Sequence, residues 1–293
     1  MPTNNAEFVL DNVFNVKAKV AVITGGGSGL GLMAAQALAV NGAKVYIIGR
    51  TEAKLARAVA AHGDGIQGSL IPIVGDVSRK DDIRRLVKEI EEREEYLDIL
   101  INNAGIYSNK QSPEGSTAEQ VKHNLFDAEN ATFENWTNVY ATNVAAIYFV
   151  TTAFLPLLQR ASSHRPGQTS TVINISSING LIKESLSRFA SNAAKAATIH
   201  LTKMLAVEVA NCKLAIRVNS IAPGLFPSEI TTGTSDDCQK SSLPPGTCSD
   251  IPAARPGTDV DMASAIIFAA TNQYLNGQII AIDGGYLVKY GTL

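Results

Sequence analysis

Short apolar runs alternate with longer segments of helical periodicity from residue 19 to residue 282. Each run is rich in valine and isoleucine and is bounded by glycine, asparagine, aspartate or serine, which is typical of a strand buried on both faces. Such strands, separated by helices, predict a parallel sheet covered by helices on both sides. We expect strands at residues 19–24, 44–49, 69–75, 97–102, 170–176, 216–222 and 277–282.

The segments between these strands predict helices over 30–42, 52–62, 79–94, 133–160, 189–211 and 259–271. Together they favour one doubly wound α/β domain over residues 1–293. Residues 106–132 and 225–258 interrupt the alternation, because they are rich in Ser, Thr, Pro and Gly and too long for ordinary connections. Both follow strands, so both emerge at the carboxyl edge of the sheet, where open α/β sheets bind ligands. We expect an inserted segment near the pocket at 106–132 and a mobile substrate lid at 225–258.

The composition indicates a soluble globular protein, with 45% hydrophobic residues, 25 basic and 27 acidic residues and a formal net charge of −2. The evenly spread charge predicts no nucleic-acid partner. No apolar run approaches the ~18 residues of a membrane span, so we expect no membrane partner. The odd cysteine count and the lack of a secretory signal favour a cytoplasmic location, with a Cys238–Cys248 bridge as the weaker alternative. We predict no metal site.

The stretch TGGGSGLG, residues 24–31, directly follows the first predicted strand and opens the first predicted helix. Glycines at such a turn bring backbone N–H groups and the helix N-terminus against a pyrophosphate. The second strand ends about 20 residues further on, which is the context of a dinucleotide-binding turn. That strand ends in Gly49-Arg50-Thr51. A guanidinium in place of an acid favours the 2′-phosphate of NADP(H) over the free ribose of NAD(H).

With these motifs in place, the sequence resembles the short-chain dehydrogenase/reductase family over nearly its whole length. The motifs that carry the resemblance are the turn at Thr24, Gly25, Gly29 and Gly31, the pair Asp76-Val77, N-N-A-G at Asn102 to Gly105, Asn143, Ser177, Lys195, and Pro223-Gly224 with Ser228. The family resemblance implies a Rossmann-type fold with a seven-stranded parallel sheet and helices on both faces. It also implies a homodimer or homotetramer joined through the helices at 133–160 and 189–211.

The resemblance, together with the glycine-rich turn and Arg50, assigns a set of cofactor-binding residues. They are Thr24, Gly25, Gly27, Ser28, Gly29, Leu30, Gly31, Arg50, Thr51, Asp76, Val77, Asn103, Ala104, Gly105, Lys195, Pro223, Gly224 and Ser228. In the family's mechanism a tyrosine phenol supplies the proton, a lysine lowers the phenol pKa and holds the nicotinamide ribose, a serine binds the carbonyl, and an asparagine supports a relay water. Asn143, Ser177 and Lys195 match three of these four roles.

Ser191 stands where the family has its catalytic tyrosine, four residues before Lys195 in FASNAAK. Its oxygen lies closer to the backbone than a phenol oxygen would, and an alkanol titrates far above the ~10 of a phenol. Proton delivery is therefore impaired or rerouted, with a water bridging to Lys195 as one route. Tyr107, Tyr140 and Tyr148 are candidate replacements, although the last two lie on an apolar helix pattern. The sequence leaves open whether Ser191 is natural or a Tyr→Ser inactivation.

Three functions are compatible with these residues. The first is an NADP(H)-dependent oxidoreductase that reduces a ketone or imine, or oxidises a secondary alcohol, of a mid-sized metabolite such as those of secondary metabolism. The second is a non-redox enzyme, a cyclase, isomerase or lyase, that uses Lys195 or Ser177 for electrostatics. The third is a cofactor-binding regulator. Retention of Asn143, Ser177 and Lys195 favours the first function over the third.

Overall fold

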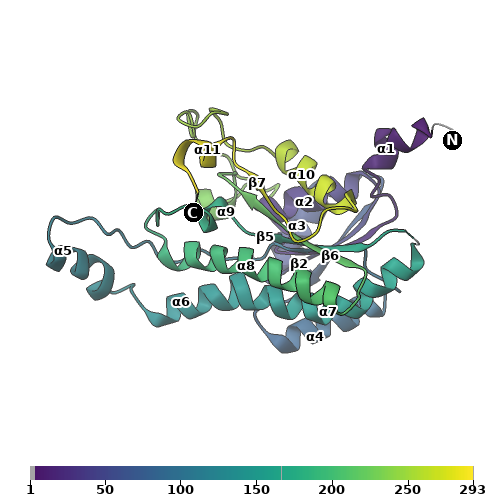
Figure 1. Ribbon diagram of the computed structural model, residues 1–293, viewed down its shortest axis with the longest axis horizontal. Helices are drawn as coiled ribbons and strands as arrows, with labels where there is room; N and C mark the ends of the chain where they lie inside the picture. Colours follow the sequence, from purple (N-terminus) through teal and green to yellow (C-terminus); the bar gives the residue numbers. More distant parts are fainter. Residues whose placement is uncertain (1–3, 166, 293) are drawn as a thin grey trace.

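The seven predicted strands form one parallel sheet in a computed structural model that describes residues 4–165 and 167–292 (Figure 1). The strands are β1 (Val20–Thr24), β2 (Lys44–Gly49), β3 (Ser69–Val74), β4 (Ile99–Asn102), β5 (Ser170–Ile175), β6 (Ile216–Pro223) and β7 (Ile279–Ile282). Their order across the sheet is β3-β2-β1-β4-β5-β6-β7. The predicted fold class is confirmed. Of the range 1–293 predicted as one domain, residues 1–3, 166 and 293 lie outside the described residues.

Helices cover both faces of the sheet. The helices of the described residues are α1 (Leu10–Val13), α2 (Gly29–Val40), α3 (Glu52–His62), α4 (Lys80–Glu91), α5 (Ala118–Lys122), α6 (Phe133–Tyr140), α7 (Ala146–His164), α8 (Phe189–Asn211), α9 (Glu229–Thr232), α10 (Asp259–Thr271) and α11 (Tyr286–Tyr290). Those that pack against the sheet are α2, α3, α4, α7, α8 and α10. Short 3-10 turns lie at Asn5–Phe8 and Ile178–Gly180, and π-helical turns at His123–Asp127 and Ala141–Ala145. The six predicted helices are present, the fourth of them in two parts, whereas the short elements were not expected.

Two apolar cores separate the sheet from these helices, because successive strand residues point to opposite faces. In β1, Ala21 and Ile23 pack into one core with residues of α2, α3 and α10. Val20 and Val22 pack into the other core with residues of α4, α7 and α8. Figure 1 shows α2 and α10 on one side of the sheet and α4, α7 and α8 on the other. Burial on both faces explains why the strands are continuous apolar runs.

The chain reverses its direction across the sheet between β1 and β4. It runs outward from β1 through β2 to β3, then returns to place β4 on the other side of β1. Thr24 at the end of β1 is in register with Asn102 at the end of β4. The turns after both strands therefore leave the sheet at the same level. A crevice at such a switch point is where open α/β sheets bind their ligands.

The run Phe133–His164 is long and apolar enough to cross a membrane by length and composition, which the sequence analysis did not anticipate. The apolar residues of its second half face the sheet, where Val150, Phe154 and Leu157 are buried against β4, β5 and α4. Burial in the core of a doubly wound domain accounts for this apolarity. The run is also not one regular helix, because a π-helical turn at Ala141–Ala145 separates α6 from α7.

The two long connections differ in how they lie against the sheet. Figure 1 shows α5, within 106–132, at the end of an arm that extends away from the sheet. Only Ile106 and Tyr107 of this connection line the main cavity. Residues 225–258 lie over the carboxyl edge and bury Phe226 and Ile251. The roles of these segments as pocket wall and mobile lid stay predictions.

Candidate active site

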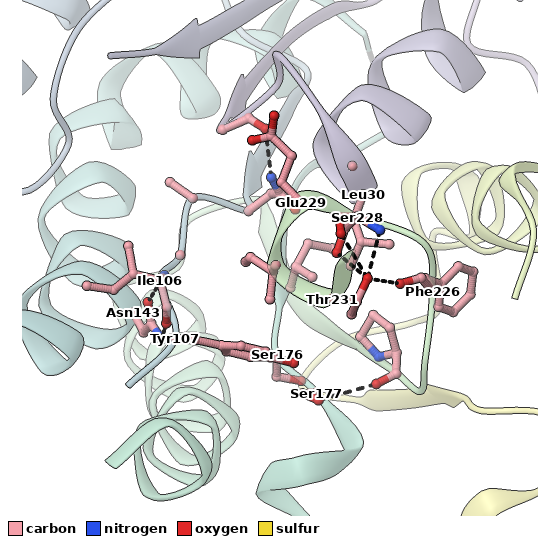
Figure 2. Close-up of a pocket in the computed structure, with 18 of the residues that line it drawn as sticks. Leu30, Ile106, Tyr107, Asn143, Ser176, Ser177, Phe226, Ser228, Glu229 and Thr231 are labelled. Atoms are coloured by element: carbon pink, nitrogen blue, oxygen red, sulfur yellow. Dashed lines mark hydrogen bonds between the residues drawn. The ribbon is translucent and has the colours of Figure 1, made fainter. Parts of the chain in front are cut away.

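The main cavity lies at the carboxyl edge of the sheet, beyond the ends of β1, β4, β5 and β6, and has a volume of about 230 Å³ (Figure 2). It brings together most of the residues that the sequence analysis singled out. Those that line it are Gly25, Ser28, Gly29, Leu30, Asn103, Ala104, Gly105, Asn143, Ser177, Lys195, Pro223, Gly224 and Ser228. The remaining lining residues are Ile106, Tyr107, Ile175, Ser176, Phe226, Glu229, Ile230 and Thr231.

The glycine-rich turn closes one end of this cavity. Gly25 has a φ of +66°, in the left-handed region that glycine favours. A Cβ on Gly31 would lie 2.1 Å from the carbonyl oxygen of Gly25, so only glycine fits there. Asn103 holds the turn in place, because its side-chain amide donates to the backbone oxygens of Thr24 and Gly25, both at 3.0 Å. Thr24 and Gly31 therefore build the turn without lining the cavity.

The N-terminus of α2 has the features of a phosphate site. Its N-cap, Ser28, makes no side-chain capping bond to the first turn, and that turn carries no acidic residue. The backbone donors and the positive end of the helix dipole thus face the cavity without an internal partner of their own. These residues fit the pyrophosphate of a nicotinamide dinucleotide.

A second groove continues past Gly25 on the other side of the turn. It is lined by Ile48, Gly49, Arg50, Gly75, Asp76, Val77 and Thr142, together with residues 104–106. Arg50 is exposed here. Burial opposes ionisation of Asp76, but hydrogen bonds from Ser78 and the charge of Arg50 outweigh it and lower the pKa of this carboxyl. The groove thus presents a guanidinium and an ionised carboxylate at the end of β2 and β3, where the predicted adenosine half would lie.

Ser177 and Lys195 line the floor of the main cavity. The Ser177 hydroxyl accepts from the Asn179 amide at 3.1 Å and donates to the Pro223 carbonyl at 3.4 Å. Its neighbour Ser176 is 3% exposed and its hydroxyl is engaged with β6, so Ser177 is the more accessible of the two. Lys195 donates to the Ile175 carbonyl at 2.8 Å.

Burial of the Lys195 ammonium lowers its pKa to about 8 from the usual 10.5. Desolvation penalises the charged form, and the folded protein supplies only a carbonyl as compensation. A lysine with this pKa changes its protonation state close to neutral pH. It can therefore bind ribose hydroxyls and also adjust the charge next to a reacting carbonyl.

Asn143 lies inside the π-helical turn between α6 and α7 and is 1% exposed. Its side-chain oxygen accepts from the Ile106 amide, and its side-chain nitrogen donates to the Ile106 carbonyl, both at 2.9 Å. This reciprocal pair fixes the chain just after N-N-A-G. The backbone oxygen of Asn143 accepts from Thr198 of α8 at 2.8 Å. The insertion of one residue in a π turn, a feature common at functional sites, brings the amide to this position.

Ser191 does not line the cavity. It is 2% exposed, and its Oγ accepts from the backbone amide of Ser108 at 2.5 Å. The hydroxyl at the position predicted to correspond to the family's tyrosine therefore binds a backbone amide and is not directed into the cavity. Gly27 and Thr51 likewise lie outside both grooves, as part of the turn and as the residue before α3.

Tyr107 is the phenol that the cavity contains. Figure 2 shows its ring extending from the side where Asn143 lies toward Ser176 and Ser177. The guanidinium carbon of Arg188 lies 4.8 Å from the ring centre, within cation–π range. Burial raises the pKa of Tyr107 above its usual value, and the charge of Arg188 offsets part of that rise. The only sequence signal for this residue was the absence of a tyrosine at position 191.

Glu229, which the sequence analysis did not single out, also faces the cavity. It begins α9 and accepts from Lys54 at 2.8 Å on both oxygens and from Ser28 at 3.4 Å. Burial opposes ionisation, but hydrogen bonds from Lys54, Ser235 and Ser28 hold the pKa of Glu229 below its usual value. An ionised acid thus lies beside the phosphate turn. The neighbouring residue, Ser228, packs against Gly29. A Cβ added at Gly29 would lie 2.9 Å from the Cβ of Ser228.

Known proteins are similar to this chain in sequence and in fold. The family model for short chain dehydrogenases matches residues 19–239. The chain belongs to the short-chain dehydrogenase family. Among family members, the short-chain dehydrogenase/reductase PhomF of Diaporthe leptostromiformis is 36% identical over 285 residues, covering 94% of each chain. A rhamnolipid-biosynthesis 3-oxoacyl-[acyl-carrier-protein] reductase of Pseudomonas aeruginosa is 35% identical, covering 93% of this chain and 98% of its own.

Solved structures of the short-chain dehydrogenase family have the same fold. The active-site complex of Pseudomonas aeruginosa RhlG with NADP superposes with a TM-score of 0.75 at 30% identity, over 94% of this chain and 98% of that one. A short-chain dehydrogenase/reductase from Mycobacterium marinum gives a TM-score of 0.76 at 27% identity, over 94% and 98%. The chain is therefore an oxidoreductase-family protein along almost its entire length.

Proposed function

We propose that the protein is an NADP(H)-dependent oxidoreductase that reduces a ketone or imine, or oxidises a secondary alcohol, of a mid-sized metabolite. The observation that supports this most is the single cavity that joins the phosphate turn to Asn143, Ser177 and Lys195. Bound there, the nicotinamide coenzyme would supply or accept the hydride. Ser177 would donate a hydrogen bond to the carbonyl oxygen, and Lys195 would hold the ribose.

Preference for NADP(H) rests on Arg50, which is exposed in the second groove at the end of β2. A guanidinium pairs with a phosphate through charge-assisted hydrogen bonds, and Gly49 offers no carboxylate for a free ribose. A relative whose structure contains NADP, RhlG, agrees with this choice.

The names of the relatives support a substrate class for this proposal. Several relatives are named as 3-oxoacyl-[acyl-carrier-protein] reductases and one as a 5-keto-D-gluconate 5-reductase, so ketones beside a polar group are the first candidates. The protein would act on a free small molecule or thioester in the cytoplasm. By analogy with the family it would assemble as a homodimer or homotetramer.

The binding test compares NADPH and NADH by the change in coenzyme fluorescence. We expect NADPH to bind at least tenfold tighter, the effect of one or two charge-assisted hydrogen bonds. Arg50→Glu should erase or invert the preference. Arg57→Glu makes the same charge change on an exposed position of α3 and should leave the preference intact. Equal affinities in the unmodified protein would contradict the assignment.

The activity test follows NADPH oxidation with a panel of 3-oxoacyl thioesters, keto acids and aryl ketones. Product analysis in the absence of coenzyme runs beside it, because Ser191 at the tyrosine position also motivates a non-redox reaction. Coenzyme-independent conversion of a panel member, without NADPH oxidation, would favour the cyclase, isomerase or lyase alternative. A matched inactive control is Lys195→Met, which keeps the fold of α8 and removes the ammonium.

A further inference from the structure

Three titratable side chains line the main cavity among the described residues: Tyr107, Lys195 and Glu229. Glu229 is held ionised by Lys54 and has no proton to give at neutral pH. Lys195 is bound to the Ile175 carbonyl. Ser191, at the position where the family has its proton donor, lies outside the cavity and is buried. The cavity thus retains one neutral acidic group next to Ser177.

We propose that Tyr107 is the catalytic acid of this protein, and that Ser191 positions it by binding the backbone of Ser108. The inference rests on the proposed reductase function and identifies the group that completes it. The catalytic phenol would then belong to the segment that follows β4 and not to α8, where the family has it.

The two residues that flank Tyr107 are fixed by different elements. Asn143 binds both backbone polar groups of Ile106 at 2.9 Å. On the far side of Tyr107, the Ser108 amide donates to Ser191 Oγ at 2.5 Å, and the Ser108 carbonyl accepts from the Arg188 guanidinium. Tyr107 is therefore held at both of its peptide bonds by α6–α7 and α8. The backbone that carries Tyr107 is thus fixed, although the residue itself is 38% exposed, and a fixed backbone favours the positioning that proton transfer requires.

Arg188 acts on the ring as well as on the backbone. Its guanidinium carbon lies 4.8 Å from the centre of the Tyr107 ring. A guanidinium at this distance restricts rotation of the ring. Figure 2 shows the ring extending toward Ser176 and Ser177. The charge also favours the phenolate that forms when the proton leaves. Because burial raises the pKa of Tyr107, the phenol is protonated at neutral pH, as a proton donor must be.

The small size of Ser191 makes this arrangement possible. The residue is 2% exposed, and the Ser108 amide nitrogen lies 2.5 Å from its Oγ. A tyrosine ring that left position 191 in the direction of this Oγ would meet the Ser108 backbone. A serine there leaves the space free and satisfies a buried amide whose orphaning would cost about 1–3 kcal/mol.

The bound coenzyme would supply the hydride that reduces the carbonyl carbon and would itself be oxidised. The O–H bond of Tyr107 breaks, and its proton forms the new O–H bond on the substrate oxygen while Ser177 donates a hydrogen bond to the same oxygen. The Tyr107 phenolate then takes a proton from solvent water, which restores the acid for the next turnover.

The first experiment uses Tyr107→Phe, with Tyr148→Phe as the matched control because Tyr148 is 46% exposed on α7 and does not line the cavity. We expect Tyr107→Phe to lower kcat for ketone reduction by roughly 10²-fold or more and to abolish the fall in rate at high pH that marks a deprotonating acid. NADPH affinity should stay within about twofold of the unmodified value. A reductase rate within threefold of the unmodified protein would overturn the assignment.

A second readout needs no substrate. Ultraviolet difference titration reports tyrosinate formation, and the positively charged nicotinamide ring of NADP⁺ should lower the pKa of a phenol beside it. We expect NADP⁺ to shift the titration of one tyrosine in the unmodified protein and in Tyr148→Phe, and the shift to be absent in Tyr107→Phe. A shift that persists in Tyr107→Phe, or no shift when NADP⁺ is bound, would refute the placement of Tyr107.

Ser191→Ala separates a positioning role from a catalytic one. Loss of the hydrogen-bond acceptor should lower kcat about tenfold or less and speed hydrogen exchange at the Ser108 amide. The fall in the reductase rate at high pH should remain. If Ser191 itself delivered the proton, Ser191→Ala would instead cost about 10²-fold or more and Tyr107→Phe would be mild. Failure of the unmodified protein to bind either NADPH or NADP⁺ would count against the proposed function. Normal binding with an unaffected Tyr107→Phe would count against this inference alone.

Discussion

The carboxylate of Glu229 lies beside the turn where the proposed coenzyme would place its pyrophosphate, so its removal should tighten coenzyme binding. It is 3.4 Å from Ser28 at the N-cap of α2 and 2.8 Å from Lys54. Glu229→Gln keeps the shape and an oxygen that can accept from Lys54, and removes the charge. It also leaves Lys54 unneutralised beside the phosphate turn. Both changes favour binding of the coenzyme pyrophosphate at this turn.

The magnitude follows from Coulomb's law. For a phosphate charge roughly 6 Å from the carboxylate, at an effective dielectric constant of about 40, the repulsion is about 1.4 kcal/mol, or a tenfold change in affinity. We expect the NADPH Kd of Glu229→Gln to be about tenfold lower at low salt. The gain should shrink in about 0.5 M salt, where the screening length falls well below 10 Å.

Fluorescence titration of NADPH at two salt concentrations measures the effect. Asp237→Asn is the control, because Asp237 is an exposed carboxylate of the same 225–258 segment outside the cavity. It should change Kd by less than twofold. If Glu229→Gln also leaves Kd within twofold at low salt, the carboxylate moves away when coenzyme binds, and the electrostatic reasoning is wrong.

Further outcomes are expected for stability and motion. Asp98 is 5% exposed and accepts hydrogen bonds from the Val20 amide and from Arg165, both at 2.8 Å. Asp98→Ala should therefore lower the free energy of unfolding, measured in urea, by about 3–5 kcal/mol. A loss below about 1 kcal/mol would contradict a structural role. Because the pKa of Lys195 is about 8 in the fold and 10.5 unfolded, the folded state releases its proton first as pH rises. The unfolding free energy should therefore rise relative to Lys195→Met between pH 8 and 10.5, by at most about 3 kcal/mol, and a flat difference would refute the shift. Hydrogen exchange in 225–258 should slow when NADPH and a ketone are both present, and equal protection without them would contradict a lid.

The strands could be predicted to within two residues because buried parallel strands are continuous apolar runs with polar ends. The π-helical turn at Ala141–Ala145 could not be predicted, because a single inserted residue in a helix hardly alters the periodicity of its apolar positions. That turn depends on tertiary contacts of Asn143 with Ile106 and Thr198, which are 37 and 55 residues away in sequence. The short helices α5 and α9 lie in segments whose polar composition is typical of loops.

The candidate site was predictable where one residue type is required by local backbone geometry. The turn needs glycine at Gly25 and Gly31, and such positions are visible in a sequence. The presence of Glu229 in the site was not predictable, because an acid beside a phosphate turn opposes the expected chemistry. Its partner Lys54 also lies 175 residues away in sequence. Charge arrangements of this kind depend on which segments meet at the sheet edge, and periodicity carries no information on that.

In the proposed mechanism, the serine at position 191 and the phenol of Tyr107 depend on each other. The space between α8 and the segment after β4 is occupied by the Ser108 backbone, whose amide lies 2.5 Å from Ser191 Oγ. A side chain that leaves position 191 in the direction of this Oγ would meet the backbone that anchors Tyr107. In the proposed mechanism, the serine at position 191 therefore supports the placement of another proton donor. Because Ser177 and Lys195 stay on the cavity floor, the phenol can approach the same carbonyl from the side of Asn143 without any change in the rest of the site.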